Sequence, residues 1–146
     1  MLYYMQIHQL NLADYISKAL ILPSKYIEDR TELDIQTKNN EGILLSDGYF
    51  NSFFNDQILL ELILTKEEEA FLRKVNVKSK LIDEIKIYNY PISLPISRVK
   101  TIYLYDKEIQ SKLESTFNTG DVGYLPFDKI KIVTKKFLKQ LPKLCA

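Results

Sequence analysis

The sequence predicts a single α+β domain with a mixed or mainly antiparallel sheet and three to four short helices. Segments typical of strands outnumber the short segments that have helical periodicity. Strands and helices do not follow one another in the regular order of parallel βαβ folds. A chain of 146 residues with 46% hydrophobic content has the size and composition of one globular domain, which we place at residues 1–146.

The first part of the chain predicts one strand, one helix and a long loop. Residues 2–7 are mostly aromatic or large and apolar, which favours a strand. Asn11 is a favourable N-cap for a helix that ends near Leu20, and Pro23 prevents its continuation. Residues 23–41 have no sustained periodicity and are expected to form a long ordered loop, a feature that is often functional.

The middle of the chain contains its most apolar run, residues 57–64, which is typical of a strand buried on both faces. A short strand over residues 42–46 and a turn at Asp47-Gly48 precede it. Glu61 is the carboxylate within the run. Because an unpaired buried carboxylate is costly, Glu61 must have a partner, reach a cleft or lie at an edge.

The remaining elements are predicted from helix caps and prolines. Thr65 and Glu68 match a capping box, so we expect a helix that begins after Thr65 and runs to about Lys74. Pro91 and Pro95 bracket an expected extended connector, since proline cannot donate to a ladder. The other expected elements are strands over residues 81–90, 99–105 and 130–133, a helix capped by Asp106, and a basic terminal helix capped by Thr134.

The charge and the cysteine content argue against several function classes. The formal net charge is +1, whereas proteins devoted to coating phosphate backbones show a strong basic excess. A single cysteine, Cys145, excludes an intramolecular disulfide and favours a reducing compartment. No run approaches the ~18 apolar residues of a membrane span, and the first residues do not resemble a signal peptide. A cytoplasmic location without membrane association is therefore expected.

The sequence contains no firm catalytic, metal-binding or phosphate-binding motif. His8 is the only histidine, so a site built on two histidines is excluded. Neither GxGxxG nor Gly-Lys-Ser/Thr occurs, and a single cysteine rules out a cysteine zinc site. We therefore predict no bound metal, no cofactor and, as the first interpretation, no catalytic activity.

The first interpretation is a non-catalytic recognition domain that binds a macromolecular partner, nucleic acid or protein, as a component of a larger complex. The long loop and the extended segment 91–98 support it. Tyrosines beside lysines favour nucleic acid or a nucleoprotein assembly, because aromatic rings stack on bases. A structural subunit whose apolar surface is covered by copies of itself is a further alternative. The candidate binding residues are Lys86, Tyr88, Tyr90, Arg98, Lys135, Lys136 and Lys139.

A rival interpretation is a small enzyme that acts on nucleic acid or a nucleotide. Glu84 and Lys86 have the local spacing of metal-dependent nucleases of the PD-(D/E)xK type, in which acids hold Mg²⁺ and the lysine positions or activates water. Asp56 or Glu61 is the candidate upstream acid. The same two residues also make an ordinary ion pair on a strand, which needs no metal.

A second enzyme alternative combines His8, Tyr49 and Glu61. Their order in the sequence is compatible with ADP-ribosyltransferase-like folds, which use a first-strand His or Arg, a middle Tyr or Ser and a later-strand Glu. In such folds these residues bind NAD and stabilise an oxocarbenium-like centre. The pattern is too degenerate to assign the chain to a family on these residues.

Overall fold

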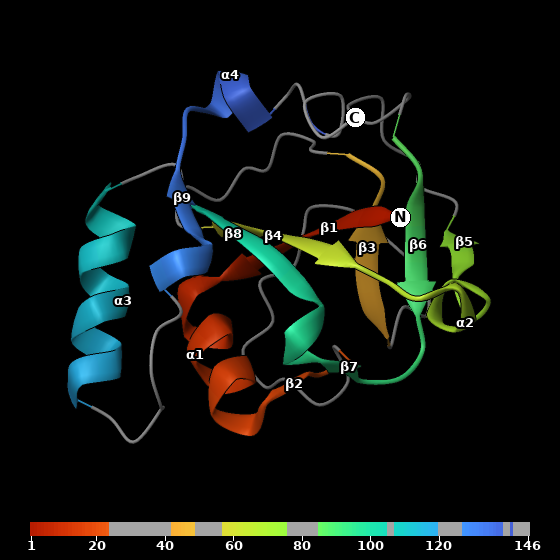
Figure 1. The fold of residues 1–146 in the computed structure, drawn as a ribbon, viewed down its shortest axis with the longest axis horizontal. Coiled ribbons are helices and arrows are strands. Elements are labelled where there is room, and N and C mark those ends of the chain that lie inside the picture. Colours follow the sequence, from red (N-terminus) through yellow and green to blue (C-terminus); the bar gives the residue numbers. More distant parts are fainter. Residues whose placement is uncertain are drawn as a thin grey trace.

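The computed structural model describes residues 1–23, 42–48, 57–75, 85–104, 107–119, 127–138 and 141. Within these ranges the chain is mixed α+β and mostly sheet, as expected (Figure 1). The strands are β1 Leu2–His8, β2 Leu20–Ile21, β3 Ile43–Ser46, β4 Gln57–Ile63, β5 Arg73–Val75, β6 Ile87–Tyr90, β7 Leu94–Pro95, β8 Val99–Leu104 and β9 Ile130–Ile132. The helices are α1 Gln9–Lys18, α2 Lys66–Glu69, α3 Lys107–Thr119 and α4 Lys135–Leu138, with 3₁₀ turns η3 Ile96–Arg98 and η4 Phe127–Lys129.

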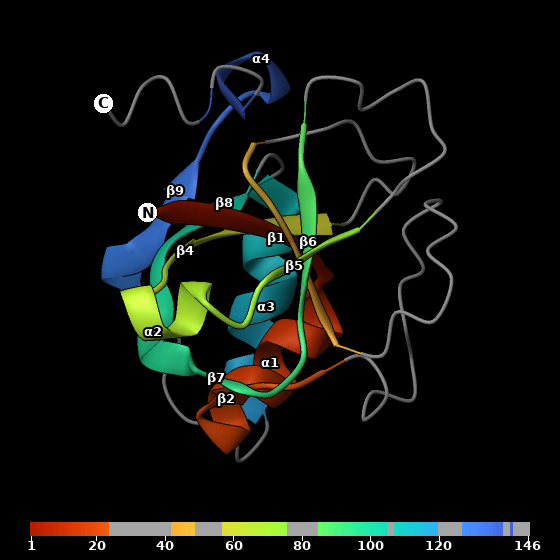
Figure 2. The same ribbon diagram turned by 90° about the vertical axis from the view of Figure 1, so that its right-hand side faces the viewer.

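The described strands form a seven-stranded mixed sheet in the order β5-β6-β3-β1-β4-β8-β9, beside a small β2-β7 pair. The pairing between β8 and β9 is parallel and the others in the large sheet are antiparallel. Figure 2 shows α1 below the sheet, next to β2 and β7. Among the described helices, none has the length and apolar character needed to cross a membrane.

The apolar run at residues 57–64 forms the central strand β4, which confirms its predicted role. Ile58 and Leu60 contribute to the larger core cluster on one face of the sheet, whereas Leu59 contributes to a second cluster on the other face. Burial on both faces therefore accounts for the lack of polar alternation. Ile63 is the exception, because its side chain is 47% exposed.

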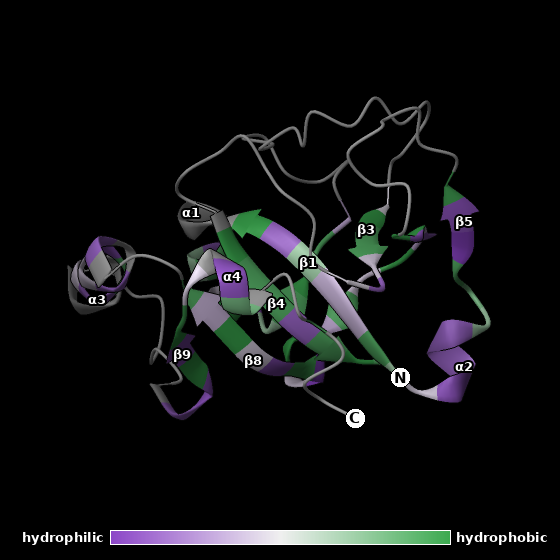
Figure 3. Cartoon of the chain, turned by 90° about the horizontal axis from the view of Figure 1, so that it is seen from above, coloured by the Kyte–Doolittle hydropathy of each residue, from purple (hydrophilic) through white to green (hydrophobic). Residues whose placement is uncertain are grey.

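Two different clusters of hydrophobic side chains pack on the two faces of the sheet. The larger core cluster combines residues of β1, α1, β3, β4 and β8, and α3 contributes Leu113. The smaller cluster contains Tyr4, Leu59, Tyr103 and Leu141, with Phe137 of α4 packed against it. Figure 3 shows hydrophobic colour along the central strands, while α2 and β5 are largely hydrophilic.

The described strands of the large sheet form two half-sheets that meet at one residue pair. β1 pairs with β4 over its full length, from Leu2↔Ile63 to His8↔Gln57. In contrast, β1 pairs with β3 only at Tyr4↔Ser46 within the described strands. Figure 1 shows β3 and β6 running in a direction that differs strongly from that of β4 and β8. We call β5, β6 and β3 the β3 half-sheet, and β1, β4, β8 and β9 the β1 half-sheet.

Two of the helix caps predicted from local sequence, at Thr65 and Thr134, are confirmed. The predicted cap at Asn11 is wrong, because α1 begins at Gln9 and Asn11 lies inside the helix, and Asp106 lies outside the described residues. Thr65 Oγ1 accepts a hydrogen bond from the Glu68 backbone N–H at 3.1 Å, and Glu68 Oε1 accepts one from the Thr65 backbone N–H at 2.9 Å. Thr134 Oγ1 likewise accepts from the Phe137 backbone N–H at 3.2 Å. The helix after Thr65 is shorter than expected, because the chain turns after Glu69 and enters β5, whose pairing with β6 overrides helix propensity.

The proline-bracketed segment was predicted as an extended connector, and its end is an extended strand that pairs with β2. Leu94 and Pro95 form β7, which pairs with Leu20 and Ile21. The Ile96 backbone N–H donates to the Ala19 carbonyl at 3.1 Å and extends this contact. The backbone of residues 94–96 is therefore already paired within the chain. Of the expected strand at 81–90, residues 87–90 form β6, whereas residues 81–84 lie outside the described ranges.

Gly42→Ala is expected to lower the free energy of unfolding by about 2 kcal/mol, as overpacking does. A Cβ at Gly42 would overlap the Tyr90 carbonyl oxygen and Asn89 Oδ1, and the Gly42 N–H donates to that same Oδ1 at 3.2 Å. Urea denaturation measures the loss, with exposed Ser97→Ala as the control, expected within about 0.5 kcal/mol of wild type. Equal stability of the two variants would contradict this close approach.

Candidate functional site

Three buried polar residues of the described chain lie in one row with Tyr4. Ser46 is opposite Tyr4, Tyr4 is opposite Glu61, and Glu61 is opposite Thr101. Each of these side chains is at most 5% exposed. The row crosses β3, β1, β4 and β8, so it includes Tyr4↔Ser46, the residue pair that joins the two half-sheets in the described part of the chain. We call these four residues the polar row.

The Glu61 carboxylate is the centre of the polar row. It accepts hydrogen bonds from the Tyr4 hydroxyl at 3.0 Å, the Thr101 hydroxyl at 3.1 Å and the Tyr103 hydroxyl at 3.4 Å. The Lys100 ammonium lies 3.7 Å from Glu61 Oε1 and supplies a positive charge. These donors offset the cost of removing a carboxylate from water. Of the three positions expected for Glu61, the structure has the first, a buried acid with partners.

A β-bulge explains how Lys100 reaches this buried acid. The register between β4 and β8 shifts after Glu61, so that Thr101 is opposite Glu61 while Val99 is opposite Leu62. Lys100 is the extra residue, and its side chain is 45% exposed. Bulges re-aim side chains in this way.

Tyr4 of β1 and two residues of β8, Thr101 and Tyr103, complete the Glu61 site, and the sequence did not predict them as its partners. Tyr4, Ser46, Thr101 and Tyr103 occupy ordinary strand positions in the sequence. The available signal was that Glu61 needed donors, but a sequence does not say which strands lie beside β4. The Glu61 carboxylate already accepts hydrogen bonds from side chains of β1 and β8, so it is poorly suited to act on a ligand.

His8 and Glu61 are not brought together. His8 ends β1 opposite Gln57, while Glu61 is opposite Tyr4. The two register positions are four residues apart, roughly 13 Å along the strands. Tyr49, Asp56 and Glu84, which complete the two enzyme alternatives, lie outside the described residues.

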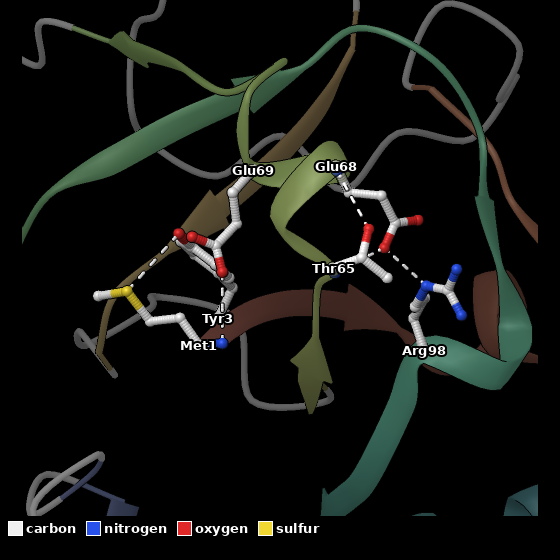
Figure 4. A network of polar contacts seen from close by, with 6 residues as sticks. All are labelled: Met1, Tyr3, Thr65, Glu68, Glu69 and Arg98. Atoms are coloured by element: carbon white, nitrogen blue, oxygen red, sulfur yellow. Dashed lines mark hydrogen bonds and ion pairs between the residues drawn. The ribbon is translucent and has the colours of Figure 1, made fainter.

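Arg98 forms an ion pair with an acid of α2. Its Nε donates to Glu68 Oε1 at 2.7 Å, and the same acid completes the capping box with Thr65 (Figure 4). Burial raises the pKa of Glu68, but the Thr65 backbone N–H and the charge and hydrogen bond of Arg98 outweigh it, so the pKa is lower than the ordinary value of 4.5. A binding role for Arg98 stays a prediction.

A second ion pair joins α2 to the start of β1. The Met1 ammonium lies 3.3 Å from Glu69 Oε1, and the Tyr3 hydroxyl contacts the Met1 sulfur at 3.9 Å (Figure 4). Together with the Arg98 pair, this contact places α2 between the start of β1 and η3. The cluster is therefore a structural junction.

Arg98→Gln is expected to lower the free energy of unfolding by about 1 kcal/mol at pH 7. Because the pKa of Glu68 is lowered in the folded state, the stabilisation is present above the unfolded pKa of 4.5 and is lost as pH falls through the folded pKa. Urea denaturation at pH 7 and at pH 3 should therefore give a smaller difference from wild type at pH 3. Exposed Arg73→Gln is the control. A difference that does not depend on pH would contradict the ion pair.

The exposed aromatic and basic surface expected on residues 86–90 is not formed. Lys86 is exposed, but its backbone N–H donates to Asp47 Oδ1 at 2.9 Å. The Tyr88 ring is half-buried and packs edge-on against Tyr3. Tyr90 is buried against Phe71, and burial raises the pKa of its hydroxyl. The reason is that other side chains of the core cover this face of β6, with Tyr3 against Tyr88 and Phe71 against Tyr90.

The predicted lysines at the C-terminal end are only partly described. Lys135 and Lys136 belong to α4, and the Lys136 side chain is exposed, whereas Lys139 lies outside the described residues. Their binding role stays a prediction. Among the described residues, no group of three or more His, Cys, Asp or Glu side chains has an arrangement that holds a metal ion.

A comparison with family models decides between the interpretations of function. The model described as "2-Component system ADP-ribosyltransferase domain" matches residues 2–132, which include β1 to β9. No curated protein and no solved structure matches the chain. The interpretation as a non-catalytic recognition domain, with nucleic acid binding, is therefore wrong, and the ADP-ribosyltransferase-like alternative is favoured. The chain belongs to the family of two-component-system ADP-ribosyltransferase domains.

Proposed function

We propose that this chain transfers ADP-ribose from NAD⁺ to an acceptor group in a two-component signalling system. The observation that carries the proposal is the family match over residues 2–132. In this reaction the bond between nicotinamide and the ribose C1′ breaks, and its electron pair leaves with nicotinamide. A nucleophile of the acceptor forms the new bond to C1′ and loses its proton to solvent or a base.

The division of the sheet supports this proposal. β1 and β3 diverge from the pair Tyr4↔Ser46, so the last residues of β1 are not laddered to β3 within the described strands. His8 is the last residue of β1. An imidazole donates or accepts a hydrogen bond, and NAD⁺ carries ribose hydroxyls, so the chemistry of His8 fits such a ligand.

The second part of the proposal concerns which acid stabilises the oxocarbenium-like centre. Glu61 is poorly suited, because three hydroxyls and Lys100 already surround its carboxylate. Glu84 is the other candidate acid in the sequence, in a segment expected to be a strand, and it precedes β6. We therefore expect Glu84 to take this role, and a comparison of the two acids by mutation tests it.

Incubation of the purified chain with NAD⁺ tests the proposed function. We expect release of nicotinamide, and labelling of an acceptor protein or of the chain itself when the adenine ring is labelled. Isothermal titration with NAD⁺ measures binding separately from turnover. Neither binding nor nicotinamide release, with the acceptors of a two-component system present, would refute the proposed function.

A further inference from the structure

The polar row connects the two half-sheets at Tyr4↔Ser46, the one position where their described strands pair. We propose that Glu61 is a positioning residue, which holds β1 at a fixed orientation relative to β3 and thereby sets the geometry of the NAD⁺ site. This inference rests on the proposed function, but its mechanical part does not require NAD⁺. Glu61 acts through Tyr4 and need not touch the substrate.

Tyr4, a residue of β1, contacts β3 through its backbone and β4 through its side chain. Its backbone makes the pair with Ser46, and its carbonyl oxygen accepts a hydrogen bond from the Ser46 hydroxyl at 3.3 Å. Its side chain hydroxyl donates to Glu61 Oε2 at 3.0 Å, and the residue is 1% exposed. The orientation of Tyr4 is therefore fixed from β3 through the backbone and from β4 through the ring.

Glu61 is itself anchored from β8. Thr101 and Tyr103 donate to its two carboxylate oxygens, and β4 is laddered on both sides, to β1 and to β8. β4 and β8 thus act as one unit against which Tyr4 of β1 is held. Apolar side chains would fill the same space. Hydrogen bonds from hydroxyls to a carboxylate also fix the orientation of the side chains that donate them, and specifying one arrangement is the best-attested use of a buried charge.

The β3 side of the junction is anchored as well. Ser46 Oγ lies 2.8 Å from the Gly48 carbonyl oxygen, which follows β3. Asp47 exchanges two hydrogen bonds with the Lys86 backbone, since the Asp47 N–H donates to the Lys86 carbonyl at 3.1 Å and the Lys86 N–H donates to Asp47 Oδ1. These bonds tie the end of β3 to the start of β6. The Tyr4–Ser46 pair is therefore a hinge point between two well-anchored parts.

A change at this hinge point is transmitted along β1. His8 is four residues beyond Tyr4 on the same strand, and a strand moves as a unit when one side is fully laddered. In catalysis a misplacement of about 1 Å costs about 10²-fold in rate. Loss of the Tyr4–Glu61 bond is therefore expected to affect the use of NAD⁺ without removing a group that contacts it.

The test compares two variants that each remove one hydroxyl from the same carboxylate. Tyr4→Phe removes the donor that β1 supplies, at the strand that pairs with β3, and Tyr103→Phe removes a donor that β8 supplies. Both rings remain in the apolar cluster. Hydrogen exchange of peptides from β3 is measured without NAD⁺. We expect exchange about fivefold faster in Tyr4→Phe and unchanged in Tyr103→Phe, as the loss of one hydrogen bond at the junction implies.

Steady-state kinetics give the second measurement. We expect Tyr4→Phe to lower kcat/KM for NAD⁺ about tenfold, mainly through KM, with Tyr103→Phe near wild type. Equal exchange and equal kinetics in the two variants, with an active wild type, would overturn the positioning role and leave the proposed function standing. The exchange difference in a chain that neither binds nor cleaves NAD⁺ would support the hinge and overturn the proposed function instead.

Discussion

Glu61→Ala should lower the free energy of unfolding by about 3 kcal/mol, one of the largest losses available at a polar residue of this chain. The hydroxyls of Tyr4, Thr101 and Tyr103 would lose their shared acceptor inside the sheet. A buried donor without an acceptor costs about 1–3 kcal/mol, and relaxation of the site reduces the sum. Urea denaturation monitored by circular dichroism measures the change.

Two variants give the control for this measurement. Glu61→Gln keeps one oxygen acceptor and the volume of the side chain, so we expect a loss of about 1 kcal/mol. Glu67→Ala removes an exposed acid from α2 and should change stability by less than about 0.5 kcal/mol. If Glu61→Ala were as stable as Glu67→Ala, the polar row would have no role in the fold.

His8→Ala is expected to lower the rate of nicotinamide release from NAD⁺ by about 100-fold, the effect of removing one well-placed polar group. The fold should be retained, because the ladder between β1 and β4 uses backbone groups and not the imidazole. A thermal melt within a few degrees of wild type checks this. An unchanged rate in His8→Ala would remove this residue from the proposed site.

The same assay of nicotinamide release, applied to variants of Glu84 and Glu61, tests which of the two acids takes part in catalysis. Glu84→Gln should lower turnover by at least about 100-fold with normal stability, whereas Glu61→Gln should lower stability more than turnover. Exposed Glu67→Ala is the control for both and should be normal in turnover and stability. The reverse pattern, with turnover lost in Glu61→Gln alone, would return the catalytic acid to β4.

The local features of the fold were predictable because they depend on neighbours in sequence. The capping box of Thr65 and Glu68 joins residues three positions apart, and the cap at Thr134 does the same. The strand at 57–63 follows from its own apolar composition. The need of Glu61 for a partner follows from the cost of an unpaired buried charge.

The site itself was not predictable in the same way. Alternation with apolar residues predicts an exposed recognition surface on Tyr88 and Tyr90, but Tyr90 belongs to the core cluster and packs against Phe71, so its ring is buried. Alternation predicts which residues share a face and does not show what covers that face. The ion pair between Arg98 and Glu68 spans 30 residues of sequence and has no local signal.

By itself the sequence determined the class of the fold, its central strand and the requirement that Glu61 be satisfied. Only the tertiary structure decided that Tyr4 and Thr101 satisfy it, 57 and 40 residues away along the chain. The physical reason is that strand order and register come from long-range pairing, which closes loops whose entropic cost depends little on sequence. The junction between the half-sheets is a product of that pairing, and so is the polar row that crosses it.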